Sequence, residues 1–160
     1  MMTRSLSAVA LLAAASAASA QRPDTSHAES MKLYPGGVVE WKAGPPALPS
    51  GVQAAILEGD PTKPGPFTMR LKFPSGTKVR PHFHSDTEHA TVVSGTLHIG
   101  MGEHFDSTAV KTLNAGSFGY WLAGTRHFAW FEGETILQVS GMGPWTVTYV
   151  NPADDPRNHH

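Results

Sequence analysis

The sequence predicts a single all-β domain of the sandwich or barrel type, built from about eight to ten short strands. Composition supports this, because the 160 residues include 16 glycines and 13 prolines, as in chains with frequent turns. The clearest strand lies at residues 67–73, where apolar and polar side chains alternate strictly. The apolar members, which we expect to face the core, are Phe67, Met69, Leu71 and Phe73.

Residues 1–20 have the pattern of a secretory signal peptide. Arg4 precedes an alanine-rich apolar run, and small residues lead up to Ala20 before the polar Gln21. The alternative, an N-terminal helix packed on the domain, does not account for the cleavage pattern. The run is too short and too poor in large residues for a transmembrane helix, so we expect no membrane attachment of the mature form. We therefore expect cleavage after Ala20 and secretion, into the periplasm if the source is a Gram-negative bacterium.

The mature chain divides into three parts by composition. Residues 21–36 are polar and predict a flexible arm, residues 37–152 carry the strand patterns, and residues 153–160 form a tail. The segment 103–110 lacks alternation and has room for one helical turn. The expected strands include 38–41, 52–57, 67–73, 90–93, 96–101, 128–131, 135–139 and 146–150.

Charge and cysteine content exclude several classes of function. The formal net charge is −1, and removal of Arg4 with the signal peptide leaves 11 basic against 13 acidic residues, or −2. No basic patch suggests a nucleic-acid partner. The chain has no cysteine, which excludes disulfides, thiolate metal ligands and a cysteine nucleophile.

A histidine pair followed by a glutamate is the strongest chemical signal in the chain. His82 and His84 are two residues apart, so on a strand both imidazoles point to the same face. After a polar turn at 85–87, Glu88 opens an apolar run that stops at Gly95. We expect a hairpin that folds Glu88 back over the two histidines. Imidazoles and a carboxylate on one face suit a divalent transition metal.

A fourth candidate ligand, His127, lies downstream. A turn at Ala123-Gly124 would reverse the chain and place His127 at the start of a strand, 128–131. Three histidines and one glutamate would then surround a metal and leave space for water or substrate.

These motifs resemble those of the cupin family. Gly76, His82, His84, Glu88 and Gly95 match the first cupin motif at every spacing. The second motif is matched by Gly116, Gly124 and His127, with Leu122 in place of its proline and Phe131 in place of its asparagine.

The resemblance implies a fold, a ligand set and an assembly. It implies a double-stranded β-helix, or jelly-roll barrel, with one divalent transition metal held by His82, His84, Glu88 and His127. The donor set accepts Fe, Mn, Co, Ni, Cu or Zn. It also implies a possible homodimer, since cupins often dimerise.

Several other side chains are candidates for the site. Arg80 shares the face of His82 if the strand is regular, so it could bind a substrate carboxylate, or it is simply solvated. Tyr120 could donate a proton inside the barrel, and Glu88 could double as a base. Gln138 could line the interior. His89 should point away from the metal because it directly follows Glu88.

Two classes of function fit these features. The first is a metal-dependent enzyme, of oxygenase, isomerase or lyase type, acting on a small organic molecule inside the barrel. The second is a non-catalytic module that binds a metal or a ligand as a sensor or carrier. A storage or structural role is disfavoured because all the metal-binding residues are present. Turnover with each metal would separate the first two.

Overall fold

A computed structural model describes residues 31–158 of the chain. The expected signal peptide, residues 21–30 of the expected arm and the last two residues of the tail lie outside this range. Within the described range, no helix is both long enough and apolar enough to cross a membrane.

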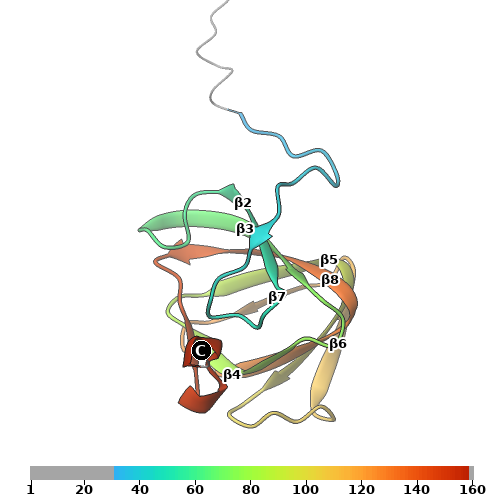
Figure 1. Cartoon of the computed structure of the whole chain (residues 1–160), viewed down its shortest axis with the longest axis vertical. Coiled ribbons are helices and arrows are strands. Elements are labelled where there is room, and N and C mark those ends of the chain that lie inside the picture. Colours follow the sequence, from blue (N-terminus) through green and yellow to red (C-terminus); the bar gives the residue numbers. More distant parts are fainter. Residues whose placement is uncertain (1–30, 159–160) are drawn as a thin grey trace, which may run out of the picture. The chain divides into compact units, whose positions relative to one another are not determined.

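The described chain is almost entirely β-structure, which confirms the predicted class (Figure 1). The first strand follows the position expected at 38–41. In the segment 103–110, residues 103–109 form bends and one turn without a helical turn, and Val110 begins a strand. Two short 3-10 turns, Pro152–Asp154 and Pro156–Asn158, come after the last strand. The strands are β1 (Lys42–Ala43), β2 (Gln53–Glu58), β3 (Gly65–Phe73), β4 (Lys78–His84), β5 (Glu88–Met101), β6 (Val110–Asn114), β7 (Phe118–Trp121), β8 (His127–Gly143) and β9 (Val147–Tyr149).

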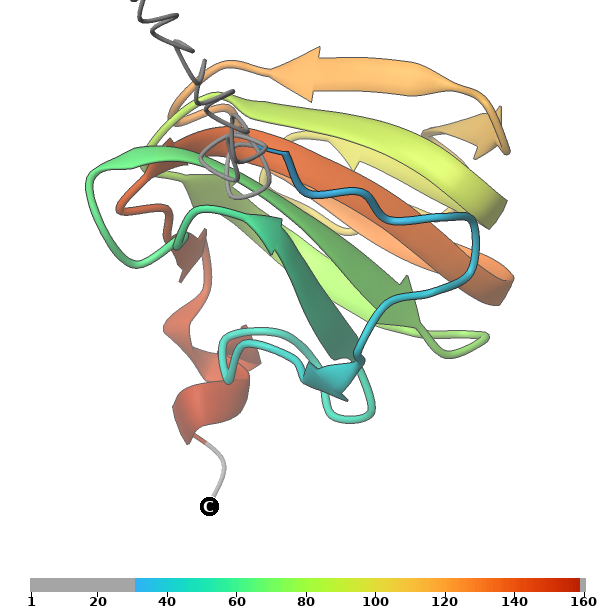
Figure 2. The same ribbon diagram turned by 90° about the horizontal axis from the view of Figure 1, so that it is seen from above.

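The strands form one antiparallel sheet that curls around a common interior, as Figure 2 shows from above. The two long strands, β5 and β8, pair with each other along most of their length and pass from one layer to the other. The second half of β8 also pairs with β3, and its first half with β4. At the opposite side, β7 pairs with the beginning of β5 and β6 with its end. This is the jelly-roll arrangement.

Two expectations about this region are wrong, namely the hairpin between the histidine pair and Glu88 and the division of residues 90–101 into two strands. β4 lies between β8 and β9 and does not pair with β5, so Glu88 does not fold back beside the histidine pair as a hairpin partner. The strands expected at 90–93 and 96–101 are one strand, β5, which bends at Gly95. In a jelly roll, strands that are neighbours in sequence cross between layers, which short-range patterns do not reveal.

The core lies between the two layers. The alternation at 67–73 is confirmed, because Phe67 and Met69 are each 1% exposed, and Leu71 and Phe73 each 3%. Phe73 stacks on Phe131 of β8 with ring centroids 3.9 Å apart. Apolar packing fills most of the interior and leaves one region that is lined by histidines.

Candidate metal centre

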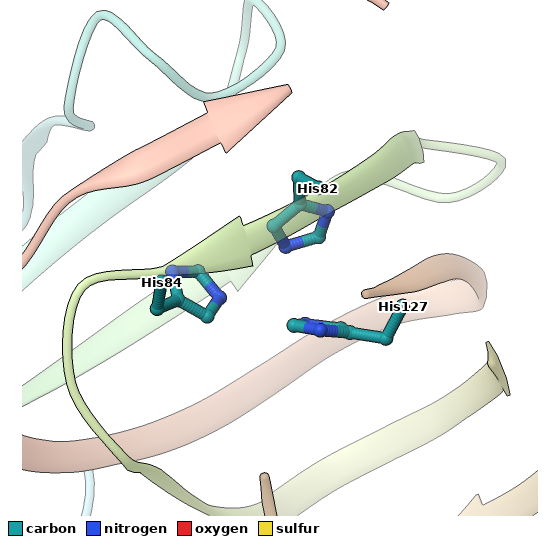
Figure 3. A group of neighbouring side chains, drawn as sticks. All are labelled: His82, His84 and His127. Carbon is teal, nitrogen blue, oxygen red and sulfur yellow. The ribbon is translucent and has the colours of Figure 1, made fainter. Parts of the chain in front are cut away.

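Three buried histidines meet inside the barrel from two paired strands (Figure 3). His82 and His84 lie on β4, and His127 begins β8 directly opposite His82. Cross-strand partners share a face, so the imidazole of His127 projects beside that of His82. One candidate ligand atom from each histidine lies within 4.8 Å of the others. The turn expected at Ala123-Gly124 is present, since Gly124 has φ +74° and β8 starts at His127.

Each of the three imidazoles is oriented by a backbone carbonyl. The Nδ1 atoms of His82, His84 and His127 lie 2.7, 2.9 and 3.0 Å from the carbonyl oxygens of Arg80, Thr146 and Thr125, respectively. A carbonyl oxygen can only accept, so each Nδ1 carries the hydrogen and each neutral ring presents an Nε2 lone pair. Imidazoles that bind metals are typically held in this way.

Glu88 places a carboxylate next to this cluster. Its Oε2 lies 2.7 Å from Nε2 of His84, and both side chains are buried. The two atoms are not aligned as a hydrogen bond, and Nε2 of His84 has no hydrogen-bond partner. When His84 is neutral, both atoms are acceptors and repel each other, so a positive charge nearby would stabilise the contact. A metal ion would supply it, and the donor set suits a divalent transition metal.

The electrostatics of the site favour the metal-binding protonation states. Burial lowers the pKa of His82 well below its usual value, and the charges of His127 and His84 lower it further. Burial also lowers the pKa of His127, although the Glu88 carboxylate opposes this. Burial raises the pKa of Glu88, but the nearby His84 and His127 outweigh it, so that pKa is lowered overall. Neutral imidazoles and an ionised carboxylate are the forms that bind metals.

These shifts predict that the metal-free protein is sensitive to acid. Unfolded histidine has a pKa of about 6.5. Below that pH, His82 and His127 bind protons in the unfolded chain but stay neutral in the folded protein, because their folded pKa values are lower. The free energy of unfolding should therefore fall as pH drops from about 6.5, by at most about 1.4 kcal/mol per pH unit for each such histidine, until the pH reaches its lowered folded pKa. At lower pH Glu88 adds to the loss. The stability that comes from its lowered pKa is complete above the ordinary carboxyl pKa and is lost as pH falls from there through the lowered folded pKa.

Urea unfolding of the chelator-treated protein at several pH values measures this effect. The control is His82→Leu, which removes one titrating group and should flatten the dependence. An equal pH dependence in both proteins would contradict the assignment of His82 as a buried neutral group.

Two tryptophans complete the walls of a small cavity around the histidines. Trp145 stacks on His84 with ring centroids 4.3 Å apart and an interplanar angle of 15°. Trp121 contacts His127 at 5.3 Å between centroids. The cavity has a volume of about 40 Å³, enough for an ion and a water molecule but not for an organic substrate. The sequence carried no signal for Trp145, because it reaches His84 through the pairing of β4 with β9, far along the chain.

Arg80 does not share the face of His82, contrary to expectation. The pairing of β4 with β8 shifts register between Val79 and His82, and these two side chains both point inward. A bulge of this kind interrupts the simple alternation of faces, so Arg80 is exposed although His82 is buried. Arg80 is exposed and packs over the ring of Phe105, with 5.0 Å to the centroid. It therefore lies outside the metal cavity.

Tyr120 and Gln138 also lie outside it, so their expected places in the interior are wrong. In the pairing of β5 with β7, Trp121 is opposite Glu88 and points inward, whereas Tyr120 is opposite His89 and is 62% exposed. Gln138 lies between two buried residues of β8, and its Oε1 accepts a 3.3 Å hydrogen bond from Nε of Arg70 on the outer face.

Two further histidines of the described range, His89 and His98, make their contacts outside the cavity. His89 is exposed and stacks near Tyr120, as its place after Glu88 predicts. His98 is buried on the outer side of β5, where its ring stacks on Trp130 and lies within hydrogen-bonding distance of Thr112 and Glu132. Neither reaches the three-histidine cluster.

A curled jelly roll with a buried three-histidine cluster defines a cupin with a candidate metal site. Residues 32–146 match the family model of the ChrR cupin-like domain, so the chain belongs to that family. No curated protein matches the sequence significantly. The resemblance to cupins is thereby confirmed.

Solved structures show the same fold at low identity. The polyketide cyclase RemF from Streptomyces resistomycificus superposes with a TM-score of 0.61 at 16% identity, covering 80% of this chain and 91% of that one. A proposed acetylacetone dioxygenase from Methylibium petroleiphilum gives 0.55 at 24% identity, with coverages of 79% and 88%. An RmlC-like cupin from Shewanella frigidimarina gives 0.53 at 18%, with coverages of 70% and 90%. At these identities the likeness concerns the fold alone.

Proposed function

We propose that the protein is an exported, metal-dependent cupin enzyme that acts on a small organic molecule, in an oxygenase, isomerase or lyase reaction. The observation that carries the proposal is the set of three buried histidines whose Nδ1 atoms are all tied to backbone carbonyls. Their Nε2 lone pairs and the Glu88 carboxylate are left to hold one divalent transition metal per chain.

The residues of the chain would hold and enclose the ion. When bound, the metal would supply Lewis acidity, or dioxygen chemistry if it is iron or copper. The apolar walls around it limit water, which strengthens charge interactions inside. The lowered pKa of Glu88 makes it a weak base at neutral pH, which favours metal ligation over proton abstraction as its role.

The narrowness of the metal cavity is the one observation that favours a purely metal-binding module. A volume of about 40 Å³ leaves little room for chemistry unless a substrate approaches from a neighbouring space. Turnover decides between the two functions, because a carrier or sensor would bind metal in stoichiometric amount and convert nothing.

Elemental analysis of mature protein purified from its native compartment is the first test. One iron or copper per chain would direct oxygen-uptake screens, and one zinc, nickel or manganese would direct isomerase and lyase assays. Stoichiometric metal without any turnover would support the binding module instead. Protein that is free of metal, and does not take up any added metal, would overturn the proposal.

Export is tested at the amino terminus of the mature protein. We expect it to begin at Gln21, because Ala18 and Ala20 provide the small residues that signal peptidase requires. Replacing both alanines by leucine should leave the precursor uncut. A mature protein that retains Met1 and stays in the cytoplasm would contradict export without affecting the metal assignment.

A further inference from the structure

A second, larger cavity opens beside the metal centre. It is a groove of about 610 Å³ between the end of β5 with β6 on one side and β7 on the other. Clefts of this volume are typical of small-molecule sites. Its lining includes Ile99, Lys111, Leu113, Tyr120, Trp121 and Leu122.

The groove shares walls with the metal cavity. Ile99 and Trp121 line both spaces, and Trp121 also contacts the ring of His127. The metal cavity itself is too small for an organic molecule. A molecule lying in the groove would therefore contact two side chains that also border the cavity of the histidines.

The lining of the groove is apolar with one charge. Lys111 is its only ionisable group of either sign apart from the Tyr120 phenol, and Lys111 makes no ion pair within residues 31–158. Lys111 is the cross-strand partner of Ile99, so it lies on the inner face of β6, toward the shared wall. No Asp or Glu lines the groove to repel an anion.

We propose that this groove binds the substrate, and that the substrate is a small amphipathic organic anion. Its apolar ring or chain would contact Leu113, Trp121 and Leu122, and its acidic group would pair with Lys111. This inference rests on the proposed enzymatic function and names the class of substrate. A second copy of the chain is disfavoured as occupant, because the groove is concave and continuous in its walls with the metal cavity.

The probe is 8-anilinonaphthalene-1-sulfonate, an aromatic anion whose fluorescence rises in apolar sites, compared with the neutral N-phenyl-1-naphthylamine. We expect each to bind the metal-loaded mature protein at one site per chain. Lys111→Met should lower the affinity for the anionic probe by roughly tenfold and leave the affinity for the neutral probe unchanged, because only the anionic probe loses an ion pair. The control is Lys78→Met, a charge removed outside the groove, which should alter neither.

A second variant guards against a fold artefact. Leu122→Glu changes a side chain that is 63% exposed, so the fold should persist. The substitution should lower the affinity for both probes, and that for the anionic probe most. Equal affinity of the anionic probe for the unaltered protein and Lys111→Met would overturn the substrate class. A dimer would also overturn the proposal if light scattering detects it, if it excludes both probes and if Leu122→Glu dissociates it.

Metal content is measured on the same samples. Both groove variants should keep one metal per chain, because neither residue lies in the metal cavity. Failure of the unaltered, metal-loaded protein to bind either probe would refute the groove and leave the enzymatic proposal standing. Protein that binds the probes as expected but no metal would refute the enzymatic proposal and leave the groove as a ligand site.

Discussion

Replacing His82 and His84 together by alanine is expected to abolish metal binding and leave a folded barrel. Both imidazoles present Nε2 to the same point, and their removal takes away two of the four candidate ligands. Loss of even an outer partner of a metal ligand costs about 10- to 100-fold in affinity, so losing two ligands should cost on the order of 10³-fold or more. Elemental analysis after dialysis measures the outcome.

The fold should survive this change because the histidines are not what holds the layers together. The core is supplied mainly by apolar side chains of β3, β5 and β8, including the stacked Phe73 and Phe131. Removing buried imidazoles also removes the close contact of His84 with the Glu88 carboxylate. Circular dichroism and a cooperative urea transition should therefore remain.

The matched control is His98→Ala. His98 is buried like the ligands, at 7% exposure, but its ring lies on the outer side of β5. It should keep one metal per chain while losing its own contacts. Stoichiometric metal in the His82→Ala, His84→Ala double variant would refute the ligand assignment.

The class of fold and the three-histidine cluster could be predicted because both depend on short-range patterns. Alternation at 67–73 fixes which side chains face inward, and the spacing of His82 and His84 puts both on one face. The motif spacing then ties them to Glu88 and His127. None of these steps requires knowledge of which strands pair.

The errors arose where pairing decides the outcome. Simple alternation predicts Arg80 on the face of His82, but a register shift before His82 leaves Arg80 exposed. Tyr120 is expected inside, but the pairing of β5 with β7 sets its neighbour Trp121 opposite the inward-facing Glu88, so Tyr120 points outward. The carbonyl of Thr146 that orients His84 is 62 residues away along the chain. Long-range pairs of this kind leave no trace in local sequence.

The two motif glycines of the first cupin motif should differ sharply in their tolerance of alanine. Gly76 and Gly95 both have φ +78°, a conformation that costs a side-chain-bearing residue about 1–2 kcal/mol. At Gly76 an added Cβ would meet nothing within 4 Å. At Gly95 it would lie 2.4 Å from Oγ1 of Thr135 and 2.5 Å from the carbonyl oxygen of Glu134.

The surroundings of Gly95 leave little room to adjust. Thr135 is fully buried, and its hydroxyl accepts a 3.1 Å hydrogen bond from the backbone N–H of Thr96 and donates to the carbonyl of Thr96. This pair of bonds fastens the bend of β5 to β8, so a methyl group at Gly95 must break it or shift backbone. Overpacking of this kind costs about 1–3 kcal/mol beyond the strained φ.

We therefore expect Gly76→Ala to lower the free energy of unfolding by about 1–2 kcal/mol and Gly95→Ala by about 2–5 kcal/mol. Urea unfolding of both variants in chelator isolates the fold from metal binding, and the equal φ angles make Gly76→Ala the matched control. Equal losses would show that β5 and β8 yield at the bend and that only the backbone angle matters. A larger loss at Gly95 would show that the motif retains this glycine because the two long strands approach too closely for a side chain.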